Sequence, residues 1–275
     1  MAPRIFACFG RGPSTSSTTA KPQYSPDFHD TADQVAEEQR RGGAVLVELF
    51  SSQGCSTSPE AEAIVSRLGR GDIGVDVPVV VLAWHVDYWD YQGWKDPFGS
   101  SFWTVRQKAF VESLQLDTLY TPQVVVQGRS QCLGTDETAI ADAARDATRF
   151  PSPTMKATFQ KPSPDVLQVS FSGALRSKVD GNGADVMVVL YENGLVTNCA
   201  RGENKGRVLS NDHVVRRSEK LLTVKDVSAK KNLSGTVQFP LWQDFNSSNC
   251  GIVLFVQNRS LQTFGVQHFQ IPDTI

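Results

Sequence analysis

An apolar run that leads directly into a helical pattern is the feature that most constrains how this chain can fold. Residues 45–50 are rich in branched apolar side chains, which is typical of a strand buried on both faces of a sheet. Residues 59–68 place Pro and acidic residues in a first turn and apolar residues along one stripe, which indicates a helix. A second apolar run follows at 78–84, so the order strand, helix, strand predicts a parallel pair whose ends lie side by side.

Cys55 lies between that strand and that helix. A sulfur just before a helix faces the positive end of the helix dipole, which favours the thiolate over the thiol. The position therefore predicts a nucleophile that is partly formed at neutral pH. The alternative is that Cys55 is a small residue at a tight turn with no chemistry, because buried free Cys is common.

Ser58 decides which redox chemistry the sequence favours. A two-thiol oxidoreductase needs a second Cys three positions after the first, to attack the mixed disulfide and release the substrate. Ser58 occupies that position. A Ser hydroxyl can donate a hydrogen bond to the Cys55 thiolate but cannot form a disulfide, so the pattern favours one-thiol exchange with glutathione or a partner protein.

Residues 85–98 follow the second strand directly and are rich in aromatic side chains. His85 and Asp87 should emerge at the same sheet edge as Cys55. One hypothesis makes His85 an acid or base oriented by Asp87. The alternative is that the rings, Trp89 and Trp94 among them, pack as a lid or line a ligand groove.

Several segments together resemble a family of thioredoxin-fold proteins known mainly from bacteria, often as secreted proteins, with plant members, and catalogued as a domain of unknown function. The segments are residues 47–55, 85–98, 106–107 and 120–123, with looser similarity at 201–209 and 213–216. The resemblance implies that the peptide bond between Thr121 and Pro122, at the start of a third predicted strand, is cis and faces Cys55. Pro122 would then shape a substrate groove, with Thr121 lining it. Many bacterial members carry Cys-x-x-Cys where this chain has Cys-x-x-Ser.

The organisation predicted from these patterns has three parts. Residues 1–42 are rich in small polar and then charged residues and are expected to be a flexible leader. Residues 44–150 are predicted as an α/β thioredoxin-like domain, with further helices at 100–114 and 135–149, the second capped by Thr135. Residues 151–275 are predicted as an all-β antiparallel sandwich-like domain, from short strands at 154–160, 166–172, 185–191, 221–227, 235–241 and 251–257. The polar, Gly-punctuated segment 202–207 is expected to connect two strands and to pack onto the first domain.

Composition and charge limit the classes of partner that the sequence predicts for this protein. The formal charge of −2 gives no basic excess for nucleic acid, and no apolar run approaches the roughly 18 residues that span a bilayer.

Without a secretory signal, an odd number of widely spaced cysteines indicates reduced thiols in the cytoplasm. Whether Cys8 is acylated stays open. The scattered His residues predict no metal site and no bound cofactor, with glutathione as a candidate co-substrate. The five cysteines are Cys8, Cys55, Cys132, Cys199 and Cys250.

Three functions remain open from the sequence. The first is a monothiol oxidoreductase that acts on a protein or small disulfide through Cys55, with Ser58 stabilising the thiolate and Pro122 shaping the groove. The second is a binding or scaffolding protein that keeps the groove without turnover. The third is an enzyme that uses His85 and Asp87 for chemistry other than redox.

Overall fold

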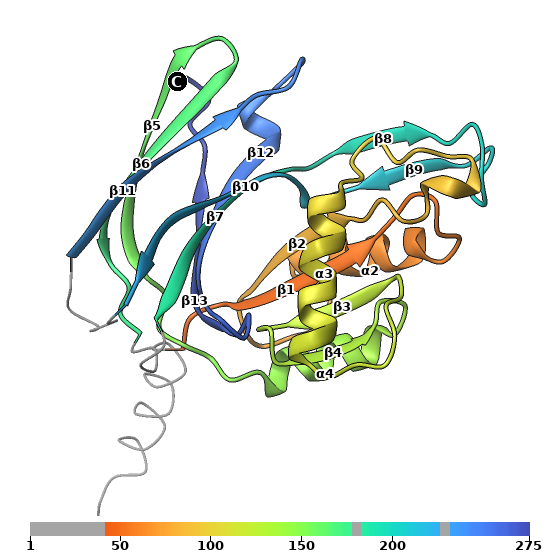
Figure 1. Ribbon diagram of the computed structural model, residues 1–275, viewed down its shortest axis with the longest axis horizontal. Coiled ribbons are helices and arrows are strands. Elements are labelled where there is room, and N and C mark those ends of the chain that lie inside the picture. The colour runs from red at the N-terminus through yellow and green to blue at the C-terminus, as the bar shows by residue number, and fades with distance from the viewer. Residues whose placement is uncertain (1–41, 178–182, 226–231) are drawn as a thin grey trace, which may run out of the picture. The chain divides into compact units, whose positions relative to one another are not determined.

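The computed structural model describes residues 42–177, 183–225 and 232–275 (Figure 1). All but the last residue of the expected leader lies outside these ranges, so the leader stays a prediction. The helices are α2 (Ser58–Arg70), α3 (Ser101–Ser113) and α4 (Glu137–Asp146), with 3-10 turns η1 (Asp90–Gln92) and η2 (Ser247–Asn249). The strands are β1 (Val45–Ser51), β2 (Val79–His85), β3 (Gln123–Val126), β4 (Ser130–Leu133), β5 (Thr154–Ser163), β6 (Val166–Ala174), β7 (Ala184–Glu192), β8 (Leu195–Asn198), β9 (Val208–Asn211), β10 (Val214–Val224), β11 (Asn232–Pro240), β12 (Cys250–Asn258) and β13 (Thr263–Gln270).

A mixed sheet of eight strands, in the order β13-β12-β7-β10-β2-β1-β3-β4, organises the fold. At its centre β1 and β2 are parallel, in a register that begins with Val45 opposite Val79. This pair was predicted, and α2 is the crossover between the two strands. On its other side β1 pairs antiparallel with β3, with Val47 opposite Val126.

The predicted fold class, an α/β thioredoxin-like domain followed by a separate all-β sandwich-like domain, is wrong. β10 pairs in parallel with β2, Val214 lying opposite Ala83, and the Ala83 N–H donates to the His213 carbonyl at 2.8 Å. Strands from both halves of the chain therefore belong to one sheet. The physical reason is that β2 is a buried apolar strand whose second edge needs a hydrogen-bonding partner, which β10 supplies. The segment boundaries 44–150 and 151–275 stay predictions.

Helices cover both faces of the sheet where β1 and β2 lie (Figure 1). On one face α2 and α4 share a core with alternate residues of β1 such as Val47 and Leu49. On the opposite face α3 packs Phe110 against Phe50 and other residues of β1 and β2. The alternation follows from the period of two along a strand. No helix in the described part of the chain is long and apolar enough to cross a membrane.

A second sheet, in the order β11-β6-β5, covers the other end of the main sheet. Leu167, Val169 and Phe171 of β6 point into a core shared with alternate residues of β7 and β12. The strands predicted in this half exist, except that residues 226 and 227 of the predicted strand 221–227 lie outside the described residues. β8, β9, β13 and the first half of β10 were missed. In α4 the N-cap is Asp136, whose carboxylate accepts the Ala139 N–H at 2.9 Å, and not the predicted Thr135.

Candidate functional site

The loop between β1 and α2 holds Cys55 just before the helix, as the sequence predicts. Hydrogen bonds inside the loop fix it: the Cys55 N–H donates to the Ser52 carbonyl at 3.1 Å, and the Ser52 N–H donates to the Ser58 hydroxyl at 3.2 Å. Ser58 is the first residue of α2, so the sulfur lies at the helix N-terminus, where the dipole stabilises negative charge. Only 3% of Cys55 is exposed to solvent.

The surroundings of Cys55 favour its thiolate. Burial raises the pKa of the thiol, but hydrogen bonds from Ser58, Thr121 and Thr57 outweigh burial and leave the pKa below its ordinary value. The sulfur lies 3.4 Å from the Thr57 Oγ1, while the protonated Cys55 thiol donates to the Thr121 carbonyl oxygen at 3.7 Å, a contact that by itself favours the thiol. Ser58 and Thr121, both named from the sequence, are thus brought together at the sulfur.

The other cysteines that the structure describes differ from Cys55 in this respect. Burial raises the pKa of Cys132 to about 11 and that of Cys250 to about 12. It also raises the pKa of Cys199, whose thiol donates to the Arg201 carbonyl at 3.2 Å. Within the described residues, Cys55 is therefore the cysteine whose environment favours nucleophilic chemistry.

The peptide bond between Thr121 and Pro122 is cis, which confirms the expectation from the sequence. It lies just before β3 and next to Cys55. Trp89 covers the space in front of it, because its indole N–H donates to the Thr121 hydroxyl at 2.6 Å. Trp89 also packs closely against Gly54. If Gly54 carried a side chain, its Cβ would lie 2.8 Å from the Trp89 Cβ, which is too close for two carbon atoms that are not bonded. Trp89 thus spans from one neighbour of Cys55 to the other.

Replacing Trp89 with Ala is expected to speed the alkylation of Cys55 roughly tenfold, because it uncovers a buried sulfur. The rate with iodoacetamide should be compared at a pH where the thiol is fully ionised in both proteins, so that access and not ionisation is measured. Tyr91→Ala is the matched control, since Tyr91 is 78% exposed and stacks on the outside of Trp89. Equal rates for wild type and Trp89→Ala would show that Trp89 is not the cover.

His85 belongs to a buried ionic cluster behind the Cys55 loop. Its Nδ1 lies 2.8 Å from Asp96 Oδ2 and its Nε2 lies 3.2 Å from Glu62 Oε1, with all three residues at most 3% exposed. Burial lowers the pKa of His85, but the charges of Asp96 and Glu62 reverse this and raise it to about 10. The two carboxylates therefore favour an imidazolium at His85 at neutral pH.

The cluster connects to the Cys55 loop through Asp96, which also accepts the Gln53 N–H at 2.7 Å. His85 thus positions the loop through Asp96 and makes no contact with the sulfur that would allow proton transfer.

Asp87 lies elsewhere: the Thr104 hydroxyl donates to its carboxylate at 2.6 Å, which directs it toward α3 and not toward His85. Trp94 donates its indole N–H to the Gln53 side chain at 3.2 Å.

Residues from the second half of the chain complete the site. The Asn204 amide donates to the carbonyls of Gln53 and Cys55, both at 2.9 Å, and the Gln53 amide donates to Asn211 at 2.8 Å. This confirms that segment 202–207 connects two strands, β8 and β9, and packs onto the first half. Sequence reasoning missed Asn204, Asn211, Glu62 and Asp96 as site residues.

The described residues contain no group of three or more His, Cys, Asp or Glu side chains that could hold a metal ion. The ordered groups around Cys55 are instead hydroxyls, amides and indoles. Chemically the arrangement stabilises an anionic sulfur at a helix N-terminus.

Comparisons with known proteins place the chain in a family. A family model described as a protein of unknown function (DUF1223) matches residues 46–257. A crystal structure of a protein from Agrobacterium tumefaciens is 25% identical, with a TM-score of 0.57, and the match covers 84% of this chain and 96% of that one. HBP35 of Porphyromonas gingivalis shares the fold at 14% identity and a TM-score of 0.59, over 84% of this chain and 76% of that one. No curated protein matches the chain.

Proposed function

We propose that this chain, which belongs to the DUF1223 family of proteins of unknown function, uses Cys55 as a single-thiol nucleophile in thiol–disulfide exchange. The observation that carries the proposal is the contrast among the described cysteines. The pKa of Cys55 is lowered despite burial, whereas burial raises the pKa of Cys132, Cys199 and Cys250. A lowered pKa at a helix N-terminus is the usual setting of a reactive cysteine.

The reaction proceeds in two exchanges. The Cys55 thiolate attacks one sulfur of a substrate disulfide, a bond forms between the two sulfurs, and the other substrate sulfur leaves as a thiolate. Because Ser58 has no sulfur, an external thiol must attack the mixed disulfide and release Cys55. Glutathione, the abundant thiol of a reducing cytoplasm, is the proposed external thiol. One external thiol is consumed in the two exchanges, and the products are the released substrate thiol and a disulfide between the external thiol and the sulfur that Cys55 attacked.

Each neighbouring group has a separate role in this proposal. Ser58, Thr57 and Thr121 donate hydrogen bonds that stabilise the thiolate before attack and again when it leaves. Trp89 must move aside for a disulfide to reach the sulfur, because it bridges Gly54 and Thr121. The ionic cluster of His85, Asp96 and Glu62 holds the loop that carries Cys55.

A second candidate function, binding without turnover, is favoured by one observation, the 3% exposure of Cys55. A sulfur that is permanently covered cannot meet a disulfide, whatever its pKa. The surface around Trp89 and Thr121 would then serve a ligand or a partner alone. The two candidates differ in whether Cys55 reacts from the native state.

Alkylation of Cys55 as a function of pH separates them. Trapping with iodoacetamide, followed by intact mass and peptide mapping, should give a midpoint below the ordinary thiol value of about 8.5. Ser58→Ala should move the midpoint upward by about one unit, because its hydroxyl is the largest of the groups that lower the pKa. Cys55→Ser identifies the labelled peptide, and Ser56→Ala is the control, because Ser56 is exposed and is not among the described residues that hydrogen-bond the sulfur.

The exchange itself is tested with a glutathionylated peptide. We expect wild type to remove glutathione from the peptide, with a transient mass adduct on Cys55, and Cys55→Ser to form no adduct. A midpoint at or above the ordinary thiol value, together with no adduct, would overturn the redox function. Slow alkylation at every pH would instead favour binding without turnover.

A further inference from the structure

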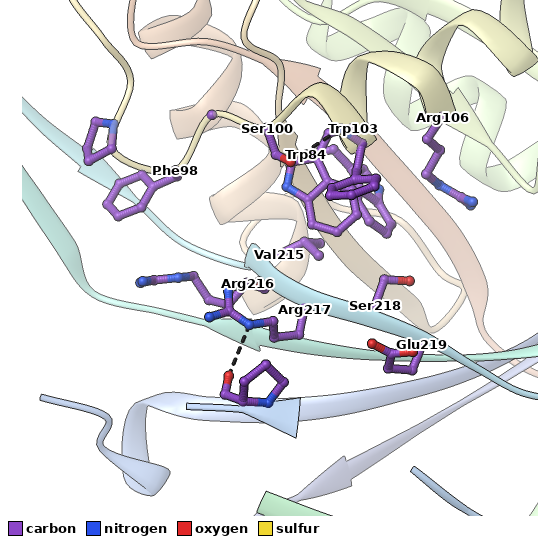
Figure 2. Close-up of a pocket in the computed structure, with 14 residues that line it drawn as sticks. Trp84, Phe98, Ser100, Trp103, Arg106, Val215, Arg216, Arg217, Ser218 and Glu219 are labelled. Carbon is purple, nitrogen blue, oxygen red and sulfur yellow. Dashed lines mark hydrogen bonds between the residues drawn. The ribbon is translucent and has the colours of Figure 1, made fainter. Parts of the chain in front are cut away.

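A cavity of about 740 Å³ lies between α3 and β10, on the face of the main sheet opposite α2. Figure 2 shows its two walls: Phe98, Ser100, Trp84, Trp103 and Arg106 above, and Val215 to Glu219 below. Its volume is in the range that holds a small organic molecule. None of the groups around Cys55 lines it, so it is separate from the proposed thiol site.

The upper wall presents aromatic surface. Trp84 and Trp103 are in edge contact, with ring centroids 4.8 Å apart, and because Trp84 is fully buried it is Trp103 that offers free ring surface. Phe102 also lines the cavity and is 76% exposed. Ring surfaces arranged in this way bind a flat apolar body by area and by stacking. The cavity therefore suits a ligand whose body is aromatic.

Guanidinium groups supply the polar part of the lining. Arg106 is paired with Glu48 and Arg216 with Glu192, and both carboxylates lie outside the lining. Arg217 differs, since it donates to two carbonyls, Pro240 at 3.0 Å and Arg216 at 2.7 Å, and has no carboxylate partner among the described residues. The positive charge of the Arg217 guanidinium is therefore not neutralised by a carboxylate of the described residues.

The lining contains one carboxylate, that of Glu219, which is exposed to solvent. Water screens an exposed charge strongly, whereas the half-buried guanidinium of Arg217 is screened less. The field inside the cavity therefore favours an anion. Arg binds a carboxylate with two parallel hydrogen bonds, which adds geometric selection to the charge.

We propose that this cavity binds a small aromatic acid. The ring system lies against Trp103 and Phe98, and the carboxylate of the ligand accepts hydrogen bonds from Arg217. The cavity is formed by residues from both halves of the chain, from Trp84 of β2 to Pro240 of β11, so it exists only because β10 joins the main sheet.

The test compares a matched pair of probes on the 275-residue chain. Naphthalene-2-carboxylate and the neutral naphthalene-2-carboxamide have the same ring and differ in charge. Binding is measured by calorimetry and by quenching of tryptophan fluorescence, since Trp84 and Trp103 line the cavity. We expect the acid to bind at least about tenfold more tightly than the amide, as a charge-assisted hydrogen bond implies.

Two variants locate the probe. Arg217→Gln should remove the preference for the acid, while Arg259→Gln, at an exposed arginine outside the lining, should leave it unchanged. Ser218→Phe should block both probes by filling the cavity, with circular dichroism confirming that the variant is folded. Absence of binding by wild type, equal affinity for acid and amide, or an unchanged preference in Arg217→Gln would each overturn the proposal.

Discussion

Replacing His85 with Gln is expected to lower the free energy of unfolding by about 3 to 5 kcal/mol. The substitution removes the positive charge between Asp96 and Glu62, which are 1% and 3% exposed. Two carboxylates are then left buried without a counter-charge, and such uncompensated buried charge is costly. The Gln side chain keeps some hydrogen-bonding capacity, so the loss measures mainly the missing charge.

Urea unfolding followed by tryptophan fluorescence measures this loss. His268→Gln is the matched control, because His268 is an exposed His with one hydrogen bond, 2.8 Å from its Nε2 to the Tyr191 hydroxyl. Its replacement should cost only about 1 kcal/mol, the usual worth of one neutral hydrogen bond. If both variants lose the same amount, the ionic cluster contributes no more than an ordinary contact.

The pH dependence of wild type provides a second readout for His85. Its pKa is raised to about 10 from 6.5, so its contribution is fully present below the unfolded value and is lost as the pH rises through the folded value. Between about pH 7.5 and 8.5 the His85 site binds about one more proton in the folded state than in the unfolded state, which should lower stability by about 1.4 kcal/mol per pH unit. Burial lowers the pKa values of His213 and His268, so both are neutral in that window. The cysteines with shifted pKa values also titrate near the top of this window, so the slope of wild type is compared with that of His85→Gln, and equal slopes would contradict a charged His85.

The sequence predicted those parts of the site that local patterns specify. The position of Cys55 before α2 could be predicted because short local patterns mark both neighbouring elements. The apolar periodicity marks the strand, and Pro and acidic residues in the first turn mark the start of the helix. The cis bond before Pro122 followed from a resemblance and not from a pattern. These elements depend on neighbours in the chain, so the chain's own order reveals them.

Glu62 and Asp96 were missed because their sequence signals have a commoner explanation. An acid near the start of a helix, such as Glu60 in the first turn of α2 or Glu62 just after it, is expected to face water and to complement the dipole. Glu62 instead turns inward, since His85 at the end of β2 lies close enough to pair with it. That proximity depends on the register of β1 and β2, which places Ser51 opposite His85.

The pairing of β10 with β2 left no local signal at all. Its contact joins residues far apart in the chain, Val214 and Ala83. The first half of β10 also lacks the alternation of a half-buried strand, because Arg216, Arg217, Ser218 and Glu219 are consecutive polar residues. In the structure these residues line the aromatic cavity. The polar residues 216–219 therefore explain both why this strand could not be predicted from its pattern and why the cavity is lined by charged groups.

Arg106→Met is expected to cost about 3 to 5 kcal/mol of unfolding free energy, while Glu48→Leu combined with Arg106→Met should recover most of that loss. Glu48 is 1% exposed in the middle of β1, and Arg106 contacts it at 2.7 Å through two nitrogens. Burial raises the pKa of Glu48 even with Arg106 present to lower it. Without Arg106 the carboxylate has no charge partner in an apolar core, and it becomes costly to keep ionised.

The packing of Arg106 makes the double variant informative. Its guanidinium lies over three rings, 4.7 Å from Trp84, 5.2 Å from Phe110 and 5.5 Å from Phe255. Met keeps an apolar stem against these rings and removes the charge. A recovery in the double variant therefore assigns the loss in the single variant to Glu48 and not to lost packing.

The pH dependence separates these causes further. In Arg106→Met the folded pKa of Glu48 lies above its unfolded value by more than in wild type, so stability is lost as the pH rises from about 4.5 through that folded value. The single variant should accordingly be closer to wild type at about pH 5 than at about pH 8, and the double variant should show no such difference. A single variant that is equally destabilised at both pH values, with no recovery in the double variant, would show that Arg106 acts through its ring contacts. The ion pair in the centre of the sheet would then contribute nothing beyond the packing of its carbon atoms.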